Sequence, residues 1–169
     1  ILLAGADERC LEEVAIIVAA LSVPDPRDRP ADKQTQADQK HAPFRDEKSD
    51  FLTLLNLWRA WSAARGELSR AKLRGWCKDQ FLSYLRLTEW QDVHAQVMEV
   101  AKGELAMKPG TQPAQYEAIH RALLAGLLAQ VAQRKEQGEY LGANGTVMAI
   151  HPGSGQFKAR PPWIVSAEQ

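Results

Sequence analysis

The chain has 169 residues, enough for one domain or slightly more, and its 45% hydrophobic and 25% charged residues are ordinary for a globular protein. Its formal net charge is zero, so overall charge indicates neither a nucleic-acid-binding nor a membrane-surface protein, and any basic surface must be local. No apolar run approaches the about 18 residues of a membrane-spanning helix, so no membrane partner is expected.

The first 22 residues are predicted to hold one central helix, because its apolar residues point to nearly all sides. Asp7 is the expected N-cap, followed by acids that suit the helix dipole. The stretch lacks the basic segment of a signal peptide, and it starts without an initiator methionine, as an excised fragment would. Cys10 and Cys77 match no zinc or redox spacing, so a reduced, cytoplasmic setting is expected.

Residues 23–30 contain three prolines, which excludes a helix and predicts an extended connector. Residues 31–40 read A-D-K-Q and then A-D-Q-K, which predicts a polar helix that packs through its alanines and ends at Pro43. Phe44 is the expected anchor of this segment in the core.

The strongest helical pattern covers residues 49–65, with Ser49 as the cap and Gly66 as the C-terminal stop. Its apolar residues recur at helical spacing, and Trp58 and Trp61 fit the core better than a base-stacking role.

The stretch from residue 65 to 86 is the most basic, with six Lys or Arg residues against two acids. Two interpretations stay open for it: an electrostatic footprint for a partner, or the solvated surface of a helix at 68–87 that begins at Ser69. A further helix is predicted at 88–104, where Thr88 and Gln91 form a capping-box pattern.

The last long helix is predicted at 115–134, with His120 beside its apolar stripe as a hydrogen-bonded core histidine. Two short strands follow around the turn Asn144-Gly145, then a glycine-rich loop at 151–155 and a third strand at 163–165. Three strands do not close a barrel.

Several motifs along the chain belong together. They are R-P-A-D-K-Q at 29–34, S-D-F-L-T-L-L at 49–55, W-C at 76–77 with F-L at 81–82, I-H-P-G-S-G at 150–155 and P-W-I-V at 162–165. In these motifs the chain resembles the helicase-associated region of DEAH-box RNA helicases of the bacterial HrpA type. The resemblance covers nearly the whole chain.

The resemblance implies a mostly α fold, a ratchet-like helical bundle followed by a small partial β-barrel of OB-fold strands. The implied domains are a helicase-associated bundle at 1–113 and, at 114–169, the last helix with the first strands of an OB-fold. The function implied is that of a C-terminal accessory segment. It grips single-stranded RNA against the RecA-like motor domains of the same protein, which use ATP and Mg, and a monomer is expected.

The chain itself contains neither G-x-x-x-x-G-K-[ST] nor D-E-A-H, so we expect no ATPase activity from it alone. The segment from Gly153 to Lys158 only superficially resembles a phosphate loop, since Pro161 and Pro162 prevent the helix that would hold phosphate. No catalytic, metal-binding or cofactor-binding residue is predicted.

A sequence-tolerant grip on RNA needs cations for phosphates and polar groups for sugars. The candidate residues are Arg86, Gln91, His94, His151, Ser154 and Lys158. His151 has a second interpretation, in which it only braces its loop. A protein-interaction module that docks a partner through an exposed strand edge is the alternative function. A small enzyme is a weak third reading, because no catalytic set recurs with useful spacing.

Overall fold

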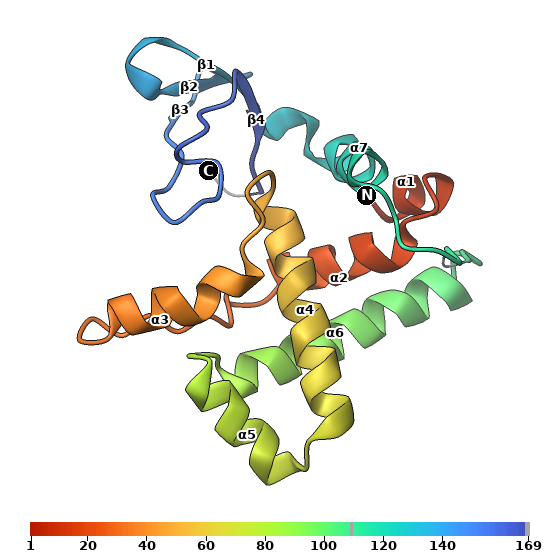
Figure 1. The fold of residues 1–169 in the computed structure, drawn as a ribbon. Coiled ribbons are helices and arrows are strands. Elements are labelled where there is room, and N and C mark those ends of the chain that lie inside the picture. Colours follow the sequence, from red (N-terminus) through yellow and green to blue (C-terminus); the bar gives the residue numbers. More distant parts are fainter. Residues whose placement is uncertain (109, 168–169) are drawn as a thin grey trace. The chain divides into compact units, whose positions relative to one another are not determined.

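The computed structural model describes residues 1–108 and 110–167, which form two compact units that interleave along the chain (Figure 1). Unit 1 comprises Ile1–Val14, Glu47–Asp50 and Ala101–Gln169, and unit 2 comprises Ala15–Asp46 and Phe51–Val100. Each unit is described by itself.

Helices dominate the chain, and a small sheet follows them. The helices are α1 (Leu2–Asp7), α2 (Leu11–Leu21), α3 (Gln34–His41), α4 (Asp50–Glu67), α5 (Arg70–Asp79), α6 (Tyr84–Gly103) and α7 (Tyr116–Leu127), with short 3-10 helices at Ala42–Phe44, Leu128–Gln130 and Glu136–Gly138. The strands are β1 (Val131–Arg134), β2 (Tyr140–Gly142), β3 (Val147–Met148) and β4 (Trp163–Val165). The predicted fold class is therefore confirmed: a mostly helical chain with a sheet that does not close into a barrel within the described residues. Across those residues, no helix combines the length and the apolar character needed to cross a bilayer.

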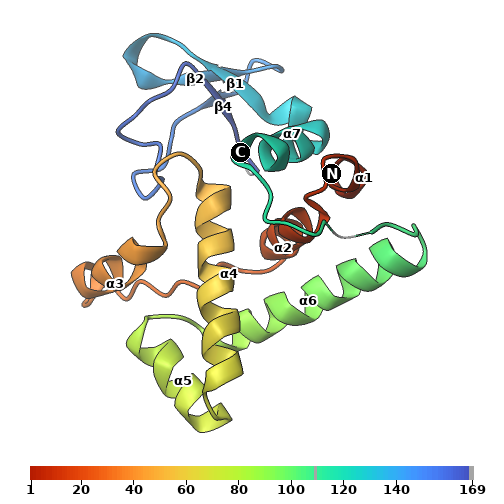
Figure 2. The same ribbon diagram turned by 45° about the vertical axis from the view of Figure 1, so that its right-hand side comes forward.

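The core of unit 2 lies where α4 crosses α6 (Figures 1 and 2). The ring centroids of Trp58 on α4 and Trp90 on α6 are 5.0 Å apart, and the rings of Trp61 and Tyr84 are edge-to-face with centroids 6.0 Å apart. The indole nitrogen of Trp90 also donates to the carbonyl oxygen of Ile16 on α2, at 2.9 Å. Trp58 and Trp61 are buried, which confirms the prediction that they belong to the core.

The connector and α3 form as predicted, since residues 22–33 contain no helix and α3 follows them. Ala37 is the only buried residue of α3, which confirms packing through alanine. Pro43 lies in the 3-10 helix that ends this segment, and the carbonyl oxygen of Phe44 accepts from the side-chain amide of Asn56 on α4, at 3.1 Å.

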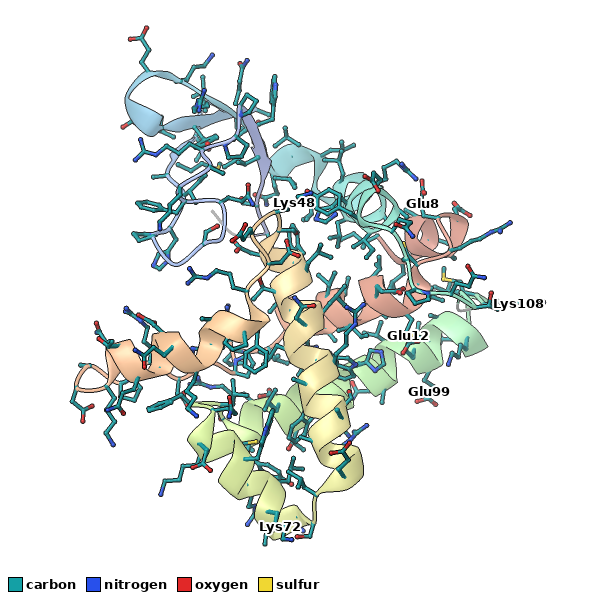
Figure 3. The ribbon with its side chains drawn as sticks, viewed as in Figure 1. Glu8, Glu12, Lys48, Lys72, Glu99 and Lys108 are labelled. Atoms are coloured by element: carbon teal, nitrogen blue, oxygen red, sulfur yellow. The ribbon has the colours of Figure 1, made fainter. Side chains whose placement is uncertain are left out.

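In unit 1, α1 packs against α7, and Leu2 and Ala6 of α1 also pack against a hydrophobic cluster at the start of α2. Glu8, labelled in Figure 3, accepts two hydrogen bonds from the guanidinium group of Arg121 on α7, at 2.9 and 2.7 Å. Leu11 is buried in a cluster with Ala101 and Met107. These contacts fix the helix that leads into the sheet.

The sheet of unit 1 has the order β3-β2-β1-β4, with every neighbouring pair antiparallel. The turn between β2 and β3 has Gly145 at φ 76°, as the Asn-Gly hairpin predicts. Tyr140 is buried on one face of the sheet, and its hydroxyl donates to the carbonyl oxygen of Pro161 at 2.8 Å. This bond holds the segment before β4 close to β2.

Three predicted helix boundaries are wrong for the same physical reason, a local hydrogen bond or turn that periodicity does not reveal. Asp7 ends α1 and caps nothing, because Arg9 adopts a left-handed φ of 58° and α2 starts only at Leu11. The predicted helix at 68–87 is interrupted at Phe81, whose φ is 53°. Thr88 lies inside α6, where its hydroxyl donates to the carbonyl oxygen of Tyr84, at 2.8 Å.

The helix predicted at 115–134 also ends early. Helix α7 stops at Leu127, and residues 131–134 form β1, which lies between β2 and β4. The sheet therefore has four strands, where the sequence predicts three. The strand arises from pairing with residues up to 34 positions away, between Val131 and Val165, so a helical pattern in the local sequence does not decide it.

Candidate nucleic-acid interface

The six residues predicted to bind RNA divide equally between the two units. Unit 2 carries Arg86, Gln91 and His94 on α6, and unit 1 carries His151, Ser154 and Lys158 in the loop between β3 and β4.

Arg86 lies against the connector that precedes α3. Its guanidinium group donates to the carbonyl oxygen of Asp25 at 3.0 Å and to a carboxylate oxygen of Asp28 at 3.3 Å. The side chain is 41% exposed, so it retains some access to solvent. Arg86 therefore acts first as a structural link between α6 and the connector.

Asp25, whose carbonyl oxygen binds Arg86, also forms an ion pair with Arg27 that orders the connector. Burial opposes ionisation of its carboxyl group, but hydrogen bonds and the positive charge of Arg27 outweigh this effect and lower its pKa. The Arg27 guanidinium donates to both carboxylate oxygens, with the shortest distance 2.7 Å. Asp25 thus stays charged at neutral pH and orders the connector.

His94 and Gln91 lie three residues apart on α6, and both are half-buried. The ring centroid of His94 is 4.8 Å from that of Trp58 on α4, with the two planes tilted. His94 therefore packs against the core of unit 2, while Gln91 is half-exposed.

The loop that carries the other three residues is held by the start of α4. The hydroxyl of Ser154 donates to one carboxylate oxygen of Asp50, and the backbone N–H of Gly155 donates to the other at 2.9 Å. The side-chain amide of Gln156 donates to the carbonyl oxygen of Glu47 at 2.6 Å. Ser154, which the sequence predicts to contact RNA, and the neighbouring Gly155 amide thus hold a carboxylate in this structure.

His151 and Lys158 lie at the two ends of this loop, and both are exposed. Nδ1 of His151 accepts a hydrogen bond from the backbone N–H of Gly153 at 3.0 Å, which fits the interpretation that His151 braces its loop. Within the described part of the chain, Lys158 makes no ion pair, so its ammonium group is open to solvent.

Replacing Asp50 with alanine is expected to release the loop. The exchange of the Gly155 amide proton with deuterium should become faster, because its acceptor is lost. The free energy of unfolding should fall by about 1 kcal/mol, because the contact is exposed to solvent. Asp92→Ala on the exposed side of α6 is the matched control, with a loss below about 0.5 kcal/mol. An unchanged Gly155 exchange rate in Asp50→Ala would contradict this contact.

A groove that the sequence does not predict lies entirely within unit 2. It has a volume of about 720 Å³, and we call it the α5 groove. The residues that line it include Lys33, Lys40, Arg74, Lys78, Phe81 and Tyr84. Arg74 and Lys78 come from the basic stretch at 65–86, so that stretch borders a concave surface. The excess of basic residues in this stretch is visible in the sequence. That Lys33 and Lys40 lie on the same groove is not, because they come from a distant segment.

Phe81 at the edge of this groove has a strained backbone. A left-handed conformation of a residue other than glycine costs about 1–2 kcal/mol. The carbonyl oxygen of Phe81 accepts hydrogen bonds from the backbone N–H of Asp28, at 2.8 Å, and is 3.0 Å from Nε2 of His41 at the end of α3. The connector and α3 thus hold the turn in its strained form.

Comparison with known proteins covers both parts of the chain. The family described as "Helicase associated domain (HA2), ratchet-like" matches residues 1–54, and the family described as "Oligonucleotide/oligosaccharide-binding (OB)-fold" matches residues 119–169. The second match begins in α7 and includes all four strands of the sheet.

Three curated relatives are similar over almost the whole chain. The ATP-dependent RNA helicase HrpA of Escherichia coli and the HrpA homolog of Haemophilus influenzae are each 44% identical over 160 residues, which is 94% of this chain and 12% of the relative. The pre-mRNA-splicing factor ATP-dependent RNA helicase prp22 of Schizosaccharomyces pombe is 30% identical over 176 residues, 99% of this chain and 14% of the relative. The chain therefore spans about an eighth of the length of these proteins.

Proposed function

Because the chain belongs to the helicase-associated and OB-fold region of DEAH-box RNA helicases of the HrpA type, we propose that it is an accessory segment that grips single-stranded RNA. The motor domains would lie elsewhere in a longer protein, where they bind ATP and Mg and move the strand. The observation that carries the proposal is the 44% identity to RNA helicases across 94% of the chain, helices and sheet alike.

The chemistry of the exposed residues supports this role. Lys158 is exposed on the loop before β4 and makes no ion pair with the residues that the structure describes, and Gln91 is a half-exposed amide residue on α6. Such groups contact phosphates and sugars without reading the bases, which suits a strand of any sequence that has to move. The residues proposed to contact RNA remain Arg86, Gln91, His94, His151, Ser154 and Lys158.

Binding of a fluorescently labelled oligouridine to the chain tests the proposal. We expect binding at about 50 mM salt that weakens strongly at about 200 mM, because phosphate contacts release counterions. Lys158→Ala should weaken binding about threefold or more and leave the thermal unfolding midpoint unchanged, since its side chain is exposed. Lys108→Ala, labelled in Figure 3, is a control that removes the same charge from another exposed site.

Arg86→Ala should behave differently from Lys158→Ala. It should weaken binding and also lower the unfolding midpoint, because it removes the link to Asp25 and Asp28. Absence of any binding at about 50 mM salt would refute RNA binding by this chain alone.

A second candidate function, docking of a protein partner through the sheet, is favoured by one observation. Trp163, Leu141 and Val147 lie in register with Gln133 across the four strands, so they share one face of the sheet. Their exposed fractions are 58%, 37% and 59%. Slower amide exchange in β3 and β4 of the full-length protein than in this chain would support docking at the strand edges.

A further inference from the structure

The α5 groove has an excess of positive charge in a chain whose net charge is zero. Lys33, Lys40 and Lys78 make no ion pair within the described residues, and the guanidinium group of Arg74 lies over the Tyr84 ring, 5.1 Å from its centroid. These residues are three unpaired lysines and one arginine held over a ring.

The carboxylates of the groove do not cancel this charge. Asp28 is already paired with Arg86, at 3.3 Å, which leaves Asp32 and Asp79 against four cations. A concave surface with a net positive charge attracts an anionic ligand more strongly than the same charges spread over a flat surface.

The groove also contains two aromatic rings. Tyr84 is covered by Arg74 and packs edge-to-face with Trp61, so its ring already has two partners. Phe81 is half-buried and is held in a strained conformation by one hydrogen bond from the backbone N–H of Asp28 and by contact with His41. Backbone strain that the surrounding structure maintains is concentrated at functional sites, which makes the Phe81 ring a candidate contact for a ligand.

We propose that the α5 groove binds a segment of single-stranded RNA, with its phosphates at Lys33, Lys40 and Lys78 and a base against Phe81. This proposal rests on the proposed function and assigns it a binding site outside the six residues predicted from sequence. Three separate lysines suit phosphates spaced along a flexible backbone, since each ammonium group is a mobile point charge. The volume lies within the roughly 300–1,000 Å³ of ligand-binding clefts.

An acidic peptide would satisfy the charge of the groove but would leave the Phe81 ring without a planar partner. A nucleic-acid strand uses both, because every base has a face that stacks on an aromatic ring. The combination of unpaired cations with an aromatic ring therefore favours RNA.

The test compares two triple variants of the full 169-residue chain that lose the same charge. Lys33, Lys40 and Lys78 are changed to glutamine in one, and Lys72, Lys102 and Lys108 in the other; Lys72 lies on α5 outside the groove (Figure 3). Binding of a labelled oligouridine of about 10 nucleotides is followed by fluorescence anisotropy at several salt concentrations. Circular dichroism confirms that each variant is folded.

We expect the groove variant to bind about tenfold more weakly than the control variant at low salt. The slope of log K against log salt should become shallower by about 2, since each lost phosphate contact contributes about 0.7. Phe81→Gly should weaken binding about fivefold or more through loss of stacking, while glycine accepts the left-handed backbone at this position.

Three results would overturn the proposal. If the unmodified chain binds RNA and the groove variant behaves like the control variant, the groove is not the site, although the proposed function stands. If the unmodified chain does not bind RNA at low salt, the proposed function fails and this site fails with it. If a polyglutamate peptide of matched charge binds the groove more tightly than the oligouridine, the ligand is a protein.

Discussion

Replacing Trp90 with alanine is expected to lower the free energy of unfolding by about 3–5 kcal/mol. The side chain is fully buried in the core of unit 2, where its ring packs 5.0 Å from that of Trp58. The substitution leaves a cavity and removes the 2.9 Å hydrogen bond to Ile16. In a chain of this length the unfolding midpoint should fall by about 2–4 °C for each kcal/mol.

Two further variants separate the causes of this loss. Trp90→Phe keeps a ring in the core but loses the indole N–H, and should cost about 1–2 kcal/mol. Trp163→Ala makes the same change as Trp90→Ala at a side chain that is 58% exposed, and should cost less than about 0.5 kcal/mol. A loss below about 1 kcal/mol for Trp90→Ala would contradict the described packing of α6 against α2 and α4.

The two cysteines are expected to resist thiol reagents until the chain unfolds. Burial raises the pKa of Cys10 to about 11, with a further contribution from the negative charges of Glu13 and Glu8. Burial likewise raises the pKa of Cys77 to about 11. Since the thiolate is the reactive form, its fraction at pH 8 falls about 100-fold from that of a thiol at its ordinary pKa.

Titration with a disulfide reagent such as Ellman's reagent measures this resistance. Neither thiol of the native chain should react at the rate of an exposed cysteine, and two thiols should react rapidly in guanidinium chloride. Lys72→Cys, at an exposed position of α5, provides the fast-reacting control in the native state. Rapid reaction of one thiol in the unmodified native chain would show that Cys10 or Cys77 is accessible.

The local sequence correctly predicted the elements whose residue types restrict the backbone to one conformation. Three prolines exclude a helix from the connector, and the Asn144-Gly145 turn fixes the hairpin of β2 and β3 because glycine accepts its positive φ. The helix beginning near Ser49 appeared as α4, since its apolar spacing matches the helical repeat over many residues. In each case the signal lies within a few neighbouring positions.

Turns with positive φ and the strand β1 were missed for the opposite reason. Arg9 and Phe81 are residues that seldom adopt a left-handed conformation, so their types give no warning of the breaks there. Residues 131–134 continue a helical pattern, yet they pair with β2 and β4. At Phe81 and in β1, hydrogen bonds to distant residues compensated the local preference, whereas the turn at Arg9 is held by hydrogen bonds within its own segment.

By itself, the sequence determined the resemblance to RNA helicases and the fold class, because these depend on motifs and on the spacing of apolar residues. The residues that hold RNA stay a prediction from side-chain chemistry. The tertiary structure alone decided which side chains are already engaged. It placed Ser154 against Asp50, 104 residues earlier, and tied Arg86 to the connector. It also gathered Lys33, Lys40 and Lys78 around one groove. Such contacts join segments that are far apart in the sequence, and a pattern of residue types along the chain does not reveal which distant segments lie close together in space.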